Sequence, residues 1–455
     1  MHGFANRTTP LTFRQNTIQS IFRFVTAGDS CLIVGTGSVG KSNLLRFIQN
    51  EDILNAYLGE VYEHFLVVYI DVNKALERSS WGLFELILHQ ILMALTSKTN
   101  DEKILQAIDD LHQRTTEPQT RYLALRFVDR AIHLVCYQLK MNLVFLIDEF
   151  DTLCSNLSAS DFSALRALRD DNKYRLMYVV TSRAELNRLV EKTRDIEPFE
   201  ELVSPNTVWL GPYSESDAKV MLQRLNTRYG VMLDEETTRK LLVATGGHPA
   251  LLRAAHRTTL EQPDHLIDAL MLSPQVFDEC DRIWHSLKDD EQKMLIDLTI
   301  NKVPSTSDPE IILYKLKKKG MIGGPWAKGY DIFSTLFAEF VKRCRRTTND
   351  DIQIDHDRRL VLVEGKIIEG LSTLEFGLIE YLESRRGQVC TRDELAEHLY
   401  PEDVIYGEDG VSDARLGTII ARVRREIEPE PKSPKYILTV RGHGYKLIDK
   451  QECIL

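Results

Sequence analysis

Short apolar runs alternate with longer stretches of helical periodicity over about the first 210 residues of the chain. The runs are rich in Val, Ile, Leu and aromatic residues and do not alternate regularly with polar positions. Such runs are typical of strands buried on both faces, as in a helix-covered parallel sheet. They are CLIV (31–34), FLVVYI (65–70), NLVFLI (142–147), RLMYVV (175–180) and TVWL (207–210). The pattern predicts an α/β domain over residues 1–212, with a parallel sheet and helices on both of its faces.

The rest of the chain is mainly helical in pattern. Residues 213–275 have apolar positions at helical spacing and are predicted to form a helical lid. Residues 276–346 predict helices and then two short strand-like pieces around a Gly/Pro-rich turn, the order of a winged helix. The polar stretch RRTTNDD (345–351) predicts a linker, and residues 352–450 predict a second compact domain that ends in two strands.

A complete G-x-x-x-x-G-K-[ST] motif follows the first apolar run and precedes a helical stretch, which is the context that a phosphate-binding loop requires. It consists of Gly35, Thr36, Gly37, Ser38, Val39, Gly40, Lys41 and Ser42. Glycines allow backbone N–H groups to turn inward around phosphates, and the helix N-terminus adds partial positive charge. The motif predicts an ATP/ADP site in which Lys41 reaches the β and γ phosphates and Ser42 binds Mg²⁺. The alternative is an ordinary glycine-rich strand-to-helix turn.

An acidic pair, Asp148 and Glu149, ends the third apolar run. Asp148 is the candidate second ligand of Mg²⁺, held through water, and Glu149 is the candidate catalytic residue that polarises the attacking water. The fourth run leads into Thr181 and Arg183, which are predicted to reach the γ phosphate or that water. The alternative for this Thr/Arg pair is a polar strand exit with a solvated arginine.

These motifs together resemble the STAND class of signalling ATPases, relatives of the AAA+ and archaeal origin-binding ATPases. The resemblance covers about residues 10–346 and rests on Asp148-Glu149, Thr181-Ser182-Arg183 and Gly247-His248-Pro249, which match the class's Walker B, sensor 1 and GxP motifs in order. It implies that Pro249 packs on the adenine, that Arg183 reads the γ phosphate, and that exchange of ADP for ATP opens the lid and drives oligomerisation. STAND proteins usually continue into a superhelical repeat array, which is not visible here, so the activating signal is unidentified.

The last 100 residues or so predict a DNA-binding unit. A helix over residues 411–427 places apolar residues on one stripe and polar residues on the opposite face, and a hairpin with a Gly-bearing tip follows. A helix with a basic face fits a major groove, and an Arg at a hairpin tip can enter the adjacent minor groove. The candidate DNA contacts are Arg415, Thr418, Arg422, Arg425, Arg441 and His443.

The segment 352–448 resembles the OmpR-type winged-helix DNA-binding domain of response regulators. The match includes residues 371–376 for the first core helix, 411–427 for the recognition helix and 439–445 for the wing. No phosphoacceptor receiver domain precedes it, and the resemblance implies that the ATPase takes its place. The alternatives are a winged helix that mediates protein contacts and a winged helix that is a vestigial fold.

Charge changes this picture only when it is divided along the chain. The 455 residues contain 57 Lys+Arg and 67 Asp+Glu, a net charge of −10, which argues against a wholly basic nucleic-acid coat. Residues 351–410 carry −9, yet residues 411–446 carry +4, as expected of a helix and wing that contact a polyanion.

Three features predict a cytoplasmic protein that does not enter a membrane. The seven cysteines are scattered without a Cys-x-x-Cys pair, no apolar run has membrane-spanning length, and the start of the sequence has no signal-peptide pattern.

These features predict an ATP-dependent switch that controls DNA binding, a STAND-type transcriptional regulator whose nucleotide state governs homo-oligomerisation and promoter binding. Its predicted partners are double-stranded DNA, further copies of itself and an unidentified signal protein, and any ATP hydrolysis is expected to be slow. Two alternatives are open: a defence-type STAND sensor or scaffold that binds protein partners, and an origin-binding or transposition-type DNA ATPase.

Overall fold

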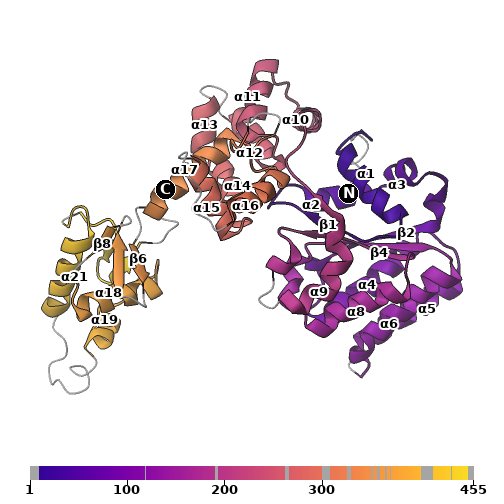
Figure 1. The fold of residues 1–455 in the computed structure, drawn as a ribbon, viewed down its shortest axis with the longest axis horizontal. Coiled ribbons are helices and arrows are strands. Elements are labelled where there is room, and N and C mark those ends of the chain that lie inside the picture. Colours follow the sequence, from indigo (N-terminus) through magenta and orange to yellow (C-terminus); the bar gives the residue numbers. More distant parts are fainter. Residues whose placement is uncertain are drawn as a thin grey trace. The chain divides into compact units, whose positions relative to one another are not determined.

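The computed structural model divides the chain into two compact units, Met1–Ala338 and Glu339–Leu455 (Figure 1). The residues that it describes are 10–117, 119–189, 193–261, 266–299, 308–324, 329–349, 352–355, 359–363, 366–368, 370–400, 413–431 and 433–448. Each unit has a hydrophobic core of its own and is treated separately below. The boundaries of the four domains predicted above stay predictions.

A five-stranded parallel sheet forms the centre of the first unit. Its strands are β1 (Cys31–Val34), β2 (Phe65–Asp71), β3 (Asn142–Asp148), β4 (Leu176–Ser182) and β5 (Thr207–Trp209), in the order β2-β3-β4-β1-β5. All five apolar runs are therefore strands, and the predicted parallel α/β class is confirmed. Because β1 lies between β4 and β5, the chain that leaves its carboxyl end emerges inside the sheet rather than at an edge.

Helices cover both faces of this sheet. They are α1 (Gln15–Thr26), α2 (Lys41–Ile48), α3 (Glu51–Leu58), α4 (Ser80–Leu95), α5 (Glu102–Thr116), α6 (Ala124–His133), α7 (Asp151–Cys154), α8 (Ala159–Asp171) and α9 (Thr193–Val203). Helices α4, α5, α6, α8 and α9 bury a large apolar cluster against one face, which includes Phe145, Phe162 and Tyr178. Helices α1, α2 and α3 lie over the other face (Figure 1). Burial on both faces explains why the strands read as unbroken apolar runs.

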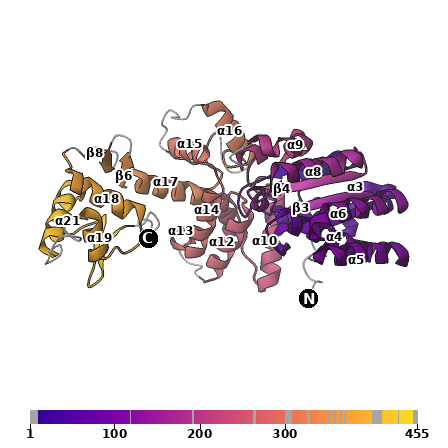
Figure 2. The same ribbon diagram turned by 90° about the horizontal axis from the view of Figure 1, so that it is seen from below.

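A helical region completes the first unit (Figure 2). It contains α10 (Glu215–Tyr229), α11 (Glu235–Thr245), α12 (Pro249–Glu261), α13 (Leu266–Leu272), α14 (Pro274–His285), α15 (Asp289–Thr299), α16 (Pro309–Lys318) and the first turn of α17 (Thr335–Asn349). Helix α12 packs against α10, α11, α13 and α14. The two strand-like pieces expected after α16 form a single antiparallel bridge, Ile322 to Ile332. The stretch predicted as a linker is helical as far as Asn349.

Beyond the rest of α17, the described residues of the second unit form an antiparallel sheet, three helices and a hairpin. The sheet contains β6 (Ile352–Asp355), β7 (Leu360–Val363) and β8 (Lys366–Ile368); the helices are α18 (Thr373–Ser384), α19 (Arg392–Leu399) and α21 (Asp413–Ile427); the hairpin is β9 (Ile437–Val440) and β10 (Gly444–Leu447). Capping boxes at Ser372 and Thr391 begin α18 and α19. The fold is that of a winged helix preceded by a small sheet.

Among the helices that the structure describes, none is both long and apolar enough to cross a lipid bilayer.

Candidate functional site

The loop between β1 and α2 leaves the carboxyl end of a fully buried strand and has the backbone shape of an anion cradle. Ser38 and Gly40 both have positive φ, 57° and 97°, so the chain turns sharply between Gly35 and the first turn of α2. A Cβ on Gly35 would lie 2.7 Å from the Leu210 carbonyl oxygen, which only glycine avoids. Ser42 lies in the first turn of α2, at the helix end that favours anions.

Lys41 bends back over this loop. Its ammonium group donates hydrogen bonds to the carbonyl oxygens of Gly35, at 2.7 Å, and Thr36, at 3.0 Å. Burial lowers the pKa of Lys41 to about 8, and Asp151 is the nearby charge that opposes this most strongly. The loop therefore holds a cation against its own carbonyl groups, close to buried carboxylates.

The acidic pair at the end of β3 is fixed by its neighbours. Asp148 is 1% exposed, and its two carboxylate oxygens accept hydrogen bonds from the hydroxyl groups of Thr181 and Tyr69, each at 2.8 Å. The Thr181 hydroxyl also accepts a hydrogen bond from the Glu149 N–H at 2.9 Å. Thr181 therefore ties both members of the pair to β4, the strand beside β3.

Glu149 differs from Asp148 in backbone and exposure. Its φ is 55°, in the left-handed region that a residue with a long side chain rarely adopts. Its carboxylate accepts a hydrogen bond from the side-chain amide of Asn73 at 2.9 Å. The turn at Glu149 directs the chain into the short helix α7, which begins at Asp151.

Arg183, at the end of β4, faces α7. Its side chain is 49% exposed, and its Nε lies 3.5 Å from Oδ2 of Asp151, whose side chain is 8% exposed. Burial raises the pKa of Asp151, and the charges of Arg183 and Lys41 act in the opposite direction. Asp151 thus lies beside both cations of the site.

The helical region approaches the same loop at Pro249, the first residue of α12. A Cβ on Gly40 would lie 3.8 Å from Cγ of Pro249 and 3.9 Å from the Tyr213 hydroxyl. Arg14 joins these parts: its guanidinium donates to the carbonyl oxygens of Val39, at 3.1 Å, and Gly211, at 3.0 Å, and lies over the Tyr213 ring. Pro249 is therefore adjacent to the loop, on the side of the α2 N-terminus.

The structure thus brings the predicted residues Lys41, Asp148, Glu149, Thr181 and Arg183 to one edge of the sheet, with Pro249 nearby. Sequence reasoning missed four residues that hold them. No sequence pattern indicated Tyr69, Asn73 or Arg14, because each reaches the site from a distant segment. A sequence pattern did indicate Asp151: it is a third acidic residue, three positions after Asp148 and just past a buried strand.

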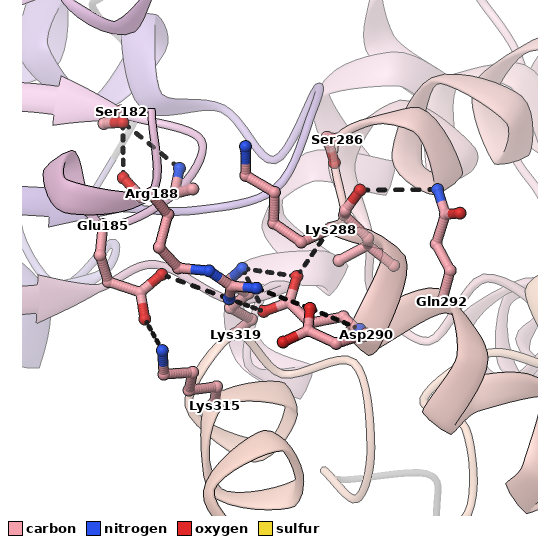
Figure 3. Close-up of polar contacts among 12 residues, drawn as sticks. Ser182, Glu185, Arg188, Ser286, Lys288, Asp290, Gln292, Lys315 and Lys319 are labelled. Carbon is pink, nitrogen blue, oxygen red and sulfur yellow. Dashed lines mark hydrogen bonds and ion pairs between the residues drawn. The ribbon is translucent and has the colours of Figure 1, made fainter. Parts of the chain in front are cut away.

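A second contact to the loop comes from the end of α14. The Gly37 N–H donates to the hydroxyl of Ser286 at 2.8 Å. Beyond Ser286, α15 and α16 meet the segment that follows β4 through charged groups (Figure 3). Arg188 binds Asp290 at 2.6 Å and Glu291 at 3.4 Å, and Glu291 also binds Lys319 at 2.6 Å. The side chains of Glu291 and Lys319 are fully buried. We call Arg188, Asp290, Glu291 and Lys319 the ion cluster.

In the second unit, α21 buries one stripe and exposes another. Leu416, Ile420, Val423 and Ile427 are buried, as the pattern predicted. The six candidate DNA contacts, which we call the basic face, are exposed: Arg415, Thr418, Arg422, Arg425, Arg441 and His443. The guanidinium of Arg415 lies over the Tyr400 ring, 4.2 Å from its centre. The last two residues of the basic face lie in the turn between β9 and β10.

Arg424 in α21 and Glu428 directly after this helix bind the hairpin instead of facing outward. Arg424 donates to the Ile437 carbonyl oxygen at 3.0 Å and to the Thr439 hydroxyl at 2.9 Å. Glu428 is buried, and its carboxylate accepts hydrogen bonds from the N–H groups of Lys435, at 2.6 Å, Tyr436, at 2.9 Å, and Ile437, at 2.7 Å. They fix the position of the wing relative to α21.

Residues 369–447 match the protein family described as "Transcriptional regulatory protein, C terminal". The C-terminal part of the chain is a winged-helix domain of this OmpR type, as predicted. It is 39% identical over 97 residues to the sensory transduction protein RegX3 of Mycobacterium tuberculosis, an alignment that covers 21% of this chain and 40% of RegX3. The chain thus spans about two fifths of the length of this curated relative.

Two solved structures are similar to different parts of the chain. The Walker-type ATPase paby2304 of Pyrococcus abyssi is 17% identical and aligns with 74% of this chain and 99% of its own length, with a TM-score of 0.49. The DNA-binding domain of RstA from Klebsiella pneumoniae, solved in complex with the RstA box, is 28% identical and aligns with 21% of this chain and 90% of its own length, with a TM-score of 0.18.

Proposed function

We propose that the protein is an ATP-dependent switch that controls DNA binding, and that it acts as a transcriptional regulator. The observation that carries this proposal is the pairing of two sites in one chain. The first is the phosphate-loop edge with Lys41, Asp148, Glu149, Thr181 and Arg183, and the second is an OmpR-type winged helix with an exposed basic face.

The residues of the phosphate-binding loop and of the sheet edge beside it fit a nucleoside triphosphate. Two buried polar atoms there, Oγ1 of Thr36 and Oδ1 of Asp151, have no hydrogen-bond partner among the described residues. Such atoms are costly unless something binds them: the Thr36 hydroxyl can donate to a phosphate oxygen, whereas the Asp151 carboxylate oxygen can only accept, for example from water on Mg²⁺. Backbone N–H groups of residues 35–42 and the Lys41 ammonium would hold the phosphates, and Pro249 would pack on the base. Ser42 and Asp148 would hold Mg²⁺, which would neutralise phosphate charge.

Glu149 would act as the base in slow hydrolysis. Its carboxylate is fixed by Asn73 and its backbone by Thr181, so that it can orient and polarise a water molecule at the edge of the sheet. Arg183 would sense the γ phosphate, because its guanidinium would exchange the contact with Asp151 for one with the phosphate.

The basic face would contact DNA, with α21 in the major groove and Arg441 and His443 at the neighbouring minor groove. The second unit as a whole is acidic, so a single copy would bind non-specific DNA weakly. Nucleotide-dependent assembly of several copies would align several basic faces on repeated half-sites and raise the apparent affinity through effective concentration. An additional protein that supplies the activating signal is part of the proposal.

The test is a comparison of the full-length protein without nucleotide, with ADP and with a non-hydrolysable ATP analogue. We expect the ATP analogue to increase both the sedimentation coefficient and the affinity for DNA carrying repeated sites. The variant Arg441→Ala should weaken DNA binding in all three states while leaving nucleotide affinity unchanged. Equal DNA affinity of the wild-type protein in all three states would contradict the switch.

A further inference from the structure

The carboxyl-terminal end of α14 lies directly on the phosphate loop. The Ser286 hydroxyl accepts a hydrogen bond from the Gly37 N–H at 2.8 Å and donates one to the Ile283 carbonyl oxygen at 2.6 Å. A Cβ on Gly37 would lie 2.9 Å from the carbonyl oxygen of Arg282 and 3.3 Å from Cβ of Ser286. Glycine at this position therefore allows the last turn of a helix, more than 240 residues later in the chain, to pack against the loop backbone.

The position of Lys41 indicates which end of a nucleotide would meet this helix. Its ammonium group lies at the carbonyl oxygens of Gly35 and Thr36. In this motif the lysine reaches the β and γ phosphates, so the outer phosphates belong at the Gly35–Thr36 side of the loop. Gly37 follows directly, and its N–H is one of the loop donors on that side. Ser286 thus occupies a donor at the end of the site that distinguishes ATP from ADP.

The electrostatics of this contact are unfavourable for a phosphate. The carboxyl end of a helix carries partial negative charge on its unpaired carbonyl groups, and α14 directs the carbonyl of Arg282 at the loop. A γ phosphate near Gly37 would be repelled by this helix end and would compete with Ser286 for the same N–H. ADP carries no γ phosphate and would bind without this competition.

We propose that Ser286 is a specificity-determining residue: while it holds the Gly37 N–H, the site prefers ADP, and ATP binds at the cost of displacing the end of α14. This inference rests on the proposed nucleotide site. It names the residue that ATP must displace.

The displaced segment is connected to the core by the ion cluster. The backbone N–H of Lys288, two residues after Ser286, donates to Glu291 at 3.1 Å. Glu291 in turn binds Arg188, which follows β4 and Arg183 in the core, and the buried Lys319 (Figure 3). Movement at Ser286 would therefore be transmitted to α15 and α16 through Glu291, and also to the segment that carries the proposed γ-phosphate sensor.

The experiment measures the affinities of full-length protein for ADP and for a non-hydrolysable ATP analogue, in the wild type, in Ser286→Ala and in Ser286→Thr. We expect Ser286→Ala to bind the ATP analogue about fivefold more tightly, the effect of removing one competing hydrogen bond, with ADP affinity unchanged. Ser286→Thr keeps the hydroxyl and should retain the wild-type ratio. Ser20→Ala is the matched control, because Ser20 also donates to a helix carbonyl oxygen but lies half-buried on α1 and makes no contact to the loop that the structure describes.

An unchanged ratio of ATP to ADP affinity in Ser286→Ala, or weaker binding of the ATP analogue, would overturn the proposal while leaving the nucleotide site intact. A wild-type protein that binds neither nucleotide would overturn the proposed function as well. Hydrogen exchange of wild-type residues 282–286 gives a test that needs no variant. The ATP analogue should accelerate exchange there and ADP should not, and equal exchange in both states would contradict displacement.

Discussion

The proposed nucleotide site and the basic face both depend on charged side chains, but they hold these charges in opposite ways. Lys41 and Asp148 are buried, and each makes two hydrogen bonds to fixed partners. Arg422, Arg425 and Arg441 are exposed. A buried charge without partners is costly, whereas an exposed arginine remains accessible to phosphates and is screened by salt. The first site should therefore respond to small changes in geometry, and the second to ionic strength.

The largest expected effect is on nucleotide binding in Lys41→Ala. Removal of the ammonium group should weaken ATP binding at least roughly 100-fold, or about 3 kcal/mol, the upper range for hydrogen bonds to a charged group. Titration of a fluorescent nucleotide into the full-length protein measures it. Lys219→Ala removes an exposed lysine of a helical surface pair and should have no effect. Similar losses in both variants would show that the contrast between buried and exposed charges is wrong.

Thr181→Val tests whether the acidic pair depends on its partners. The change keeps the shape of the side chain but removes the hydroxyl that serves both Asp148 and the Glu149 N–H. We expect the free energy of unfolding of the first unit to fall by about 2 kcal/mol, because a buried carboxylate oxygen and a part-buried N–H group lose their partner. Denaturant titration measures this. Thr227→Val, at an exposed hydroxyl on α10, should change stability by less than about 0.5 kcal/mol.

The buried lysine also predicts a pH dependence of nucleotide binding. The pKa of Lys41 is lowered to about 8, so the side chain loses its proton as the pH rises through that value. Nucleotide affinity should fall by up to roughly tenfold between about pH 7 and pH 9. Stability should change in the opposite direction, because the unfolded state binds the Lys41 proton more tightly and unfolding is therefore less favourable above pH 8. Affinity that is constant over this range would contradict the charge assigned to Lys41.

The smallest effect separates two arginines on the same helix. Arg422→Ala should weaken DNA binding by about fivefold and reduce the slope of log affinity against log salt by about one. Arg424→Ala should instead lower the unfolding free energy of the second unit, because Arg424 binds Ile437 and Thr439. Binding at several salt concentrations and denaturant titration distinguish the two. If both variants changed the salt slope equally, the division between outward-facing and hairpin-holding residues would fail.

The features that could be predicted from sequence were those encoded locally. The five apolar runs, the loop, the acidic pair and the two faces of α21 depend on spacing within one segment, and the structure has them as expected. The small sheet β6-β7-β8 was not predicted, because its strands have only 3–4 residues each.

Residues that hold the site from elsewhere could not be found in this way. Tyr69 reaches Asp148 only because β2 pairs with β3 in register, and Ser286 reaches Gly37 only through tertiary packing of α14. Such contacts leave no periodicity or spacing in the chain. Arg424 shows the same limit within a helix: its basic neighbours gave no indication that its guanidinium would turn to the hairpin.

At Glu149, the left-handed backbone opposes stability to the catalytic role that we propose for its carboxylate. Holding a non-glycine residue at φ 55° costs about 1 kcal/mol, which glycine would avoid. Glu149→Gly should therefore produce a protein that melts at higher temperature and no longer hydrolyses ATP, whereas Glu149→Gln would keep the strain and lose only the base. Stability alone would favour glycine at this position, and the base that we propose requires a carboxylate there.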